Sequence, residues 1–136
     1  MRITTQGDYA LRCVLNIARN SPAGPVSISR MVSEEGLPVD YIEQLLLKLR
    51  RCRLIKSVRG AKGGYLLERS ASLLNVRDVL EAVEGSAFEV ICARRKTKNK
   101  KCKGAEECML KGVWLGLKKE IDRYLGAATI KSLLEK

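Results

Sequence analysis

Hydrophobic residues recur at helical spacing through the first third of the chain. The spacing predicts an amphipathic helix over about 5–19, whose apolar face carries Ala10, Cys13, Val14 and Ile17. Turn-forming residues follow, and a short helix is expected over about 27–35, with Ser27 as its N-cap. A third helix is expected over about 39–53, with a buried stripe of Ile42, Leu45, Leu46, Leu49 and Cys52. Two short helices joined by a tight turn are typical of a helix-turn-helix.

Two short β-rich runs follow the third helix. They cover 54–59 and 65–68 and flank a Gly-rich turn, which predicts a β-hairpin. A hairpin placed directly after a recognition helix is a wing. Between Lys48 and Lys62 the chain has seven Lys or Arg residues and no acid. A charge run is commonly just a solvated face, but this one spans the helix end and the wing, the parts that would approach DNA phosphates.

The second half of the chain predicts two more helices with a long irregular segment between them. Asn75 is a candidate N-cap for a helix over about 75–85, and periodicity is lost from there to about residue 106. A long helix is expected over about 106–124, ended by Gly126. Its apolar residues have the a/d spacing of a helix that packs on a partner helix, which favours a dimer interface formed by Leu110, Trp114, Leu117, Ile121 and Tyr124.

The expected fold is therefore mainly α with a small β-hairpin: a winged helix-turn-helix DNA-binding domain plus a long C-terminal dimerisation helix. The DNA-binding domain is assigned to 1–85, with the helix-turn-helix at about 27–53 and the wing at about 54–68. A cysteine-containing loop is assigned to 86–108, and the dimerisation helix with a C-terminal turn to 109–136.

Composition narrows the function. The 136 residues include 26 Lys or Arg and 15 Asp or Glu, a net charge of +11 that favours nucleic acid as partner. Histidine is absent, so no Ser-His or Cys-His nucleophile is possible, and we expect neither an enzyme nor a small-molecule substrate. No apolar stretch approaches the ~20 residues of a membrane span. Without an export segment, the protein is expected in the reducing cytoplasm, where its five cysteines favour metal or redox chemistry over disulfides.

Several strings of residues resemble a known family. They are Met1–Thr4, Asp8–Arg12, Tyr41–Leu46, Lys48–Arg50 and the wing string Ser57–Leu67. Together they resemble the Rrf-two family of winged-helix transcription regulators, and the resemblance extends over nearly the whole chain. It implies a homodimer that binds double-stranded DNA, each subunit reading half of a roughly palindromic operator. A repressor role is the expectation.

The resemblance also assigns DNA contacts. The groove-facing start of the recognition helix would carry Tyr41, Glu43 and Gln44, with Glu43 accepting from a cytosine amino group and Gln44 pairing with adenine. Glu43 has an alternative role as a solubilising surface acid, but a lone acid in the most basic face favours base reading. Arg59 in the wing would enter the minor groove or contact phosphate. Further expected contacts are the phosphate-binding Lys48, Arg51 and Lys62, with Ser27, Gly63 and Gly64 on the same surface.

Many members of this family hold an iron–sulfur cluster with three cysteines, which here would be Cys92, Cys102 and Cys108. The resemblance therefore implies that 86–108 is a cluster-binding loop. Thiolates are soft ligands suited to such clusters. Nine residues separate the first two cysteines, a longer gap than is usual in the family, and five separate the second two. Asp8 stands where some members supply a fourth ligand from the partner subunit, which favours a four-iron (4Fe–4S) over a two-iron (2Fe–2S) cluster. Asp8 has an equal alternative as a first-turn acid that the helix dipole stabilises.

Other readings stay open. A cluster-free regulator of the same family, controlled by a protein partner, fits the same DNA-binding residues. Zinc bound by the three cysteines and Asp8 is a third possibility. The two remaining cysteines, Cys13 and Cys52, are interpreted as buried small hydrophobes because each lies on the apolar stripe of its helix.

Overall fold

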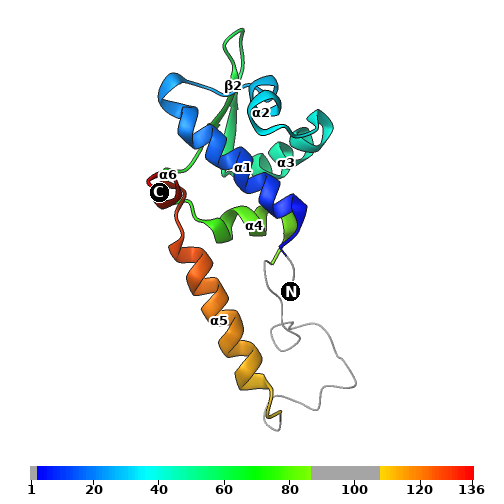
Figure 1. Ribbon diagram of the computed structural model, residues 1–136, viewed down its shortest axis with the longest axis vertical. Coiled ribbons are helices and arrows are strands. Elements are labelled where there is room, and N and C mark those ends of the chain that lie inside the picture. The colour runs from blue at the N-terminus through cyan, green and yellow to red at the C-terminus, as the bar shows by residue number, and fades with distance from the viewer. Residues whose placement is uncertain (1–2, 87–107) are drawn as a thin grey trace.

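The computed structural model describes residues 3–86 and 108–136, and a short antiparallel bridge between Asn75 and Thr129 connects the two segments. The order of elements is α1 (Thr5–Asn20), a 3-10 turn η1 (Ser21–Ala23), α2 (Ile28–Glu35), α3 (Val39–Arg51), β1 (Ile55–Val58), β2 (Gly64–Leu67), α4 (Val76–Glu84), α5 (Lys111–Ala127) and α6 (Ile130–Leu134). Helices α1 to α4 pack around one core with the hairpin rising from one end, whereas α5 extends away from them (Figure 1). The predicted class, mainly α with one winged helix-turn-helix, is confirmed.

Helix α1 forms the centre of the core. Thr4 caps it, because its Oγ1 accepts from the amide of Gly7 at 3.3 Å. The predicted apolar face is buried, and it packs against α3 and α4: Ala10, Cys13, Val14 and Ile17 are all fully inaccessible. The spacing rule therefore placed this helix and its buried face correctly.

The helix-turn-helix consists of α2, a turn at 36–38, and α3. Ser27 caps α2, its Oγ accepting from the amide of Arg30 at 3.2 Å, and Gly36 ends it. The buried side of α3 is the predicted stripe of leucines and isoleucine: Ile42, Leu45, Leu46 and Leu49. Each helix of the motif thus contributes one apolar face to the core and leaves the other exposed.

The expectation that Cys52 is buried was wrong, and the cause is the way α3 ends. The helix stops at Arg51, and Arg53 takes a left-handed backbone conformation with φ 59°. Cys52 is therefore the C-cap, one residue beyond the helix that carries the apolar stripe, and its side chain is exposed. The other stripe cysteine, Cys13, is buried as predicted.

The wing is an antiparallel hairpin whose register pairs Ile55 with Leu67 and Val58 with Gly64. Its second strand is joined to the segment that precedes α2, because the backbone of Val26 exchanges hydrogen bonds of 3.0 and 2.8 Å with Tyr65. Gly64 is required at this contact, since a Cβ there would lie 2.4 Å from the carbonyl oxygen of Val26. The position of the wing relative to α2 is therefore determined by backbone pairing.

The C-terminal part of the chain leaves the DNA-binding domain and returns to it. Helix α5 runs to Ala127, so the expectation that Gly126 ends it was wrong; the chain turns at Ala128, whose carbonyl accepts from the amide of Val76 at 2.9 Å. Ile130 at the start of α6 is fully buried in the same core as α1. The expected start of the long helix near residue 106 was too early, because α5 begins at Lys111 and the described residues 108–110 before it are not helical.

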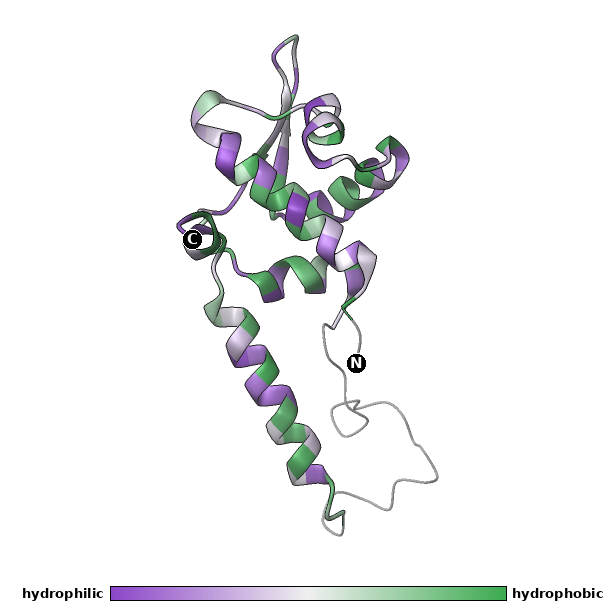
Figure 2. Cartoon of the chain, in the orientation of Figure 1, coloured by the Kyte–Doolittle hydropathy of each residue, from purple (hydrophilic) through white to green (hydrophobic). Residues whose placement is uncertain are grey.

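Hydrophobic side chains also remain on the surface. In Figure 2, α5 carries hydrophobic residues along its length, yet none of its residues is buried. Within 3–86 and 108–136, no helix has the length and apolar character needed to cross a membrane.

Candidate DNA-binding surface and metal ligands

The outer face of α3 presents polar side chains that have no partner among the described residues. Glu43 and Gln44 are exposed, and neither side chain makes a hydrogen bond or ion pair with the rest of the described chain. Glu43 is not a lone acid, because Asp40 lies exposed one turn before it on the same helix. Free acceptors and an amide on one exposed helix face are groups that can read base edges.

Two apolar side chains on this face were missed by the sequence interpretation. Val39 is 43% exposed and Leu47 is 38% exposed, although both belong to the helix that carries the core stripe. Helical periodicity could have identified both as exposed, since both fall outside that stripe. Apolar side chains beside Glu43 and Gln44 suit contact with the methyl group of thymine.

Tyr41 is placed differently from its neighbours. Its side chain is half-buried, and its ring meets the ring of Tyr9 edge-on, with centroids 5.5 Å apart at 86°. An edge-to-face pair of this kind stabilises the contact between α1 and α3 beyond the area it buries. Tyr41 therefore helps to seat the recognition helix on α1.

The basic residues of the surface fall into two groups. Arg51, Arg59 and Lys62 are exposed, and within the described residues their charged groups have no ion-pair partner. Lys48 is different, because its Nζ donates to the carbonyl oxygen of Val83 in α4 at 3.4 Å. Its charge is directed at the end of another helix.

The wing tip is tight because of its glycines. The amide of Gly63 donates to the carbonyl of Gly60 at 3.0 Å, and a Cβ on Gly63 would lie 2.3 Å from the carbonyl oxygen of Val58. Together with Gly64, which pairs with Val58 where the two strands meet the turn, this glycine permits the close turn that holds Arg59 and Lys62 at the tip. Ser27 has a local role as well, since its Oγ also lies 3.1 Å from that of Ser29.

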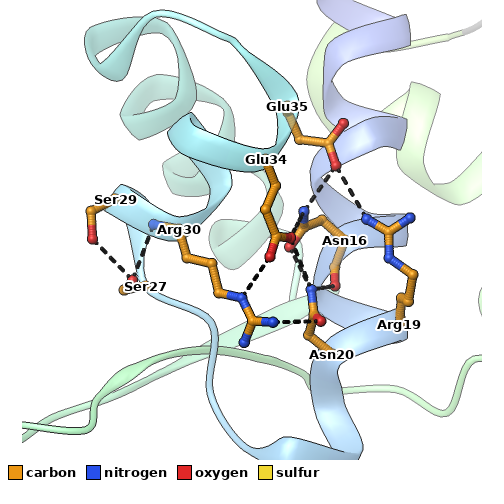
Figure 3. A network of polar contacts seen from close by, with 8 residues as sticks. All are labelled: Asn16, Arg19, Asn20, Ser27, Ser29, Arg30, Glu34 and Glu35. Carbon is orange, nitrogen blue, oxygen red and sulfur yellow. Dashed lines mark hydrogen bonds and ion pairs between the residues drawn. The ribbon is translucent and has the colours of Figure 1, made fainter.

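A polar network fixes α2 against α1 (Figure 3). The buried amide of Asn16 donates to Glu34 and Glu35 at 2.8 Å each. Arg30 donates to Glu34 at 2.8 Å and to Asn20 at 3.0 Å. The hydrogen bonds from Arg30 and then from Asn16 lower the pKa of the Glu34 carboxyl below its ordinary value. Because Asn16 is fully buried, this network specifies how the first helix of the motif sits on the core.

The stripe predicted as a dimer interface is largely open in the single chain. Leu110 is 55% exposed, Trp114 and Leu117 are each 41% exposed, and Tyr124 is 72% exposed. Ile121 is partly covered. Val113 is 58% exposed and adds a further apolar side chain to the open surface of this helix. Among the described elements, α5 packs mainly against α4. The rest of its surface is therefore available to a partner.

Of the four candidate metal ligands, two can be placed. Cys92 and Cys102 lie outside the described residues, whereas Cys108 is exposed just before α5. The Asp8 side chain lies in the first turn of α1 and is 52% exposed. Among the described residues it forms one ion pair, with the similarly exposed Arg12 at 2.8 Å. An exposed ion pair is worth little, so Asp8 is free to change partner. Both described donors therefore suit a ligand role in chemistry and in access.

The arrangement within one chain separates these two donors. Helix α5 carries its N-terminal end, where Cys108 lies, away from the core that contains α1 (Figure 1). Among the described residues, no three metal-binding side chains of the His, Cys, Asp or Glu type come together. Cys13 is unsuited to metal binding, because burial, followed by the charge of Glu35, raises the pKa of its thiol to about 12.

The helix-turn-helix, the wing and the exposed polar face of α3 together define a winged-helix transcription regulator. Residues 3–136 match the model of the Rrf2 family, described as an iron-dependent transcriptional regulator, and the chain belongs to this family.

Similar proteins support the same assignment. The chain is 36% identical over 134 residues to the HTH-type transcriptional regulator IscR of Escherichia coli O1:K1 / APEC, covering 98% of this chain and 80% of that protein. It is 35% identical over 135 residues to the IscR of Xenorhabdus nematophila, covering 99% and 80%.

Solved structures resemble it closely. The structure of CymR, the global cysteine regulator of B. subtilis, has a TM-score of 0.80 at 26% identity and covers 98% of this chain and 95% of its own. T. potens IscR has a TM-score of 0.77 at 31% identity, covering 99% and 87%. The relatives are regulators, which agrees with the prediction that the chain is not an enzyme.

Proposed function

We propose that this protein is a homodimeric transcription repressor that reads a roughly palindromic DNA operator and senses iron–sulfur status, redox conditions or nitric oxide through a cysteine-held iron–sulfur cluster. The observation that carries the DNA-reading part is the exposed face of α3, where Glu43 and Gln44 have no other partner within the described chain. Exposed polar side chains at the start of a recognition helix are the groups that contact base edges.

The surface divides into base-reading and backbone-binding parts. Glu43 accepts from a cytosine amino group and Gln44 pairs with adenine. Arg51 contacts phosphates beside the recognition helix, and Arg59 and Lys62 contact the backbone or the minor groove from the wing. Ser27, Tyr41, Gly63 and Gly64 belong to this surface mainly by holding α2, α3 and the wing in place.

The exposed stripe of α5 supports the homodimer. Large exposed apolar side chains at the N-cap, Leu110, and at 113, 114 and 117 of α5 follow helical spacing, and α5 has no buried residue. Contiguous exposed apolar patches of this kind mark interaction sites. A second copy packed on this stripe gives two-fold symmetry, which matches a roughly palindromic operator.

The cluster ligands we propose are Cys92, Cys102 and Cys108, with Asp8 of the partner subunit as the fourth. When bound, the cluster supplies an iron centre that nitric oxide and oxygen attack. Asp8 gives up its exposed ion pair with Arg12 to take this role, and Cys108 is already accessible. A ligand set shared between subunits is favoured because α5 directs Cys108 away from α1 of its own chain.

Anaerobic purification with iron and sulfide assays tests this proposal. Wild-type protein is expected to be coloured and to contain iron and sulfide. Both Cys108→Ala and Asp8→Ala are expected to lose most of this iron and sulfide. Asp40→Ala is the matched control, because Asp40 is also a first-turn acid, at the start of α3. Retention of full iron and sulfide by Asp8→Ala would exclude the fourth ligand, and loss in both acid variants would assign the effect to folding.

A second candidate is favoured by the structural similarity to a cysteine regulator, CymR. It is a regulator of the same family without a cluster, controlled by a protein partner or by zinc. Wild-type protein that stays colourless and free of sulfide after anaerobic reconstitution would support it. Stoichiometric zinc in that sample would favour metal control, and its absence would favour a protein partner.

A further inference from the structure

The C-terminal end of α4 accepts hydrogen bonds from two other helices. The side-chain amide of Gln6 in α1 donates to the carbonyl oxygen of Val83 at 2.7 Å, and Lys48 Nζ in α3 donates to the same oxygen at 3.4 Å. Beside it, the thiol of Cys52 donates to the carbonyl of Ala82 at 4.0 Å. One carbonyl thus connects the start of α1 with the recognition helix.

The physical basis of this contact is the unsatisfied end of a helix. The last carbonyls of an α-helix have no partner within the helix and carry partial negative charge. A lysine ammonium is suited to this end, and the hydrogen bond it makes there is charge-assisted. Val83 itself is only 6% exposed, so the carbonyl belongs to a packed part of the molecule.

The contact matters for reading DNA because of where Lys48 stands on α3. It lies one helical turn after Gln44, on the side of α3 that borders α4. Holding the Lys48 side chain on α4 therefore opposes rotation of α3 about its own axis. Such a rotation would move Glu43 and Gln44 away from the base edges they face.

We propose that Lys48 is a positioning residue of the recognition helix, and that Gln6, Val83 and Lys48 act as one unit that sets the angle at which α3 meets DNA. This inference rests on the proposed function. It separates Lys48 from Arg51, which has no ion-pair partner among the described residues and keeps the role of phosphate contact.

Salt-dependent DNA binding by matched variants distinguishes the two roles. Lys48→Met removes the charge at similar length, and Arg51→Met is its control on the same helix. A phosphate contact contributes about one unit to the slope of log affinity against log salt concentration, and it strengthens binding to all sequences equally. A positioning residue affects binding to the preferred sequence only. Dissociation constants are measured for a selected operator and for random DNA over a range of salt concentrations.

We expect Lys48→Met to weaken operator binding about tenfold, with random-DNA binding and the salt slope unchanged. Lys48→Arg should restore operator binding. Gln6→Leu removes an uncharged hydrogen-bond donor from α1 and should weaken operator binding to a similar degree. The double variant Gln6→Leu, Lys48→Met should lose less binding free energy than the sum of the two single losses. Circular dichroism confirms that each variant is folded.

Two results would overturn the inference: a reduced salt slope in Lys48→Met like that of Arg51→Met, or full operator affinity in Gln6→Leu. Failure of the proposed function gives a different result, because wild-type protein itself would then show no preference for any selected DNA.

Discussion

The backbone amide of Ile130 donates to the carbonyl of Leu74 at 2.8 Å, which ties the C-terminal segment to the DNA-binding domain. The Ile130 side chain is fully buried in the core that contains α1. Helix α5 is consequently anchored at its C-terminal end, while its opposite end, next to Cys108, extends away from the core. This anchoring fixes the direction of the proposed dimer helix relative to the DNA-reading surface.

Replacing Ile130 tests the anchor. Ile130→Ala leaves a cavity in the core and is expected to lower the free energy of unfolding by about 2–4 kcal/mol. Leu134→Ala, on the same short helix but 39% exposed, should change it much less. Urea denaturation at one fixed protein concentration gives both values, because the stability of a dimer depends on concentration. Equal, small effects of the two substitutions would show that α6 is not part of the core.

Charge placed on the stripe of α5 should separate the subunits. Trp114→Glu and Leu117→Glu each put a carboxylate into an apolar interface, where an unpaired charge is strongly unfavourable. We expect sedimentation equilibrium to give the mass of a monomer for both variants and of a dimer for the wild type. Lys119→Glu, an exposed charge on the same helix, is the control and should remain dimeric. Dimeric Trp114→Glu protein would place the interface elsewhere.

Glu43 and Arg59 should affect DNA binding in different ways. Glu43→Ala is expected to relax the preference at one base pair, with a loss of about 1–3 kcal/mol of discrimination. Arg59→Ala should weaken binding to selected and random DNA alike, because a backbone contact is insensitive to sequence. Competition binding with operator variants measures both effects. The assignment of roles fails if the two variants lose affinity equally on every sequence.

The thiols should differ in reactivity. Burial raises the pKa of Cys13 to about 12 from an ordinary 9.0, so at mildly alkaline pH it stays protonated, and alkylating reagents attack thiolates. Iodoacetamide followed by mass spectrometry should label the exposed Cys52 in the folded protein and Cys13 only in denaturant. Rapid labelling of Cys13 in the folded protein would contradict its burial.

The same shift sets a pH dependence of stability. Because the pKa of Cys13 is higher in the folded chain, the unfolded chain releases its thiol proton first. The contribution of this group to stability is therefore complete below pH 9.0 and is lost as the pH rises from 9.0 towards about 12. Cys13→Ala or Cys13→Ser should remove this part of the alkaline destabilisation, which urea denaturation across that pH range measures.

Local patterns predicted the elements that position the DNA-reading surface. The apolar stripes of α1 and α3, the cap at Ser27 and the Gly-rich wing turn are all encoded within a few residues of one another, so periodicity and capping rules identified them. The exposed residues Glu43 and Gln44 followed from the same periodicity, because they lie opposite the stripe.

Contacts between distant parts of the chain were not predictable in this way. Lys48 and Val83 are 35 residues apart, and only the packing of α3 on α4 brings them together. The contact of the Tyr41 ring with Tyr9 of α1 also joins two helices that lie apart in the sequence. Cys52 is exposed because α3 ends at Arg51, one residue before it, and helical periodicity does not indicate where a helix ends.

Control of DNA binding by a cysteine-held iron–sulfur cluster is tested most directly by one titration. Anaerobic wild-type protein is bound to its selected operator before and after exposure to nitric oxide, with sulfide assayed in the same sample. We predict sulfide-containing protein whose dissociation constant changes by about tenfold or more when the visible absorbance bleaches. Protein that carries no sulfide after reconstitution, or that binds the operator equally before and after nitric oxide, would contradict it.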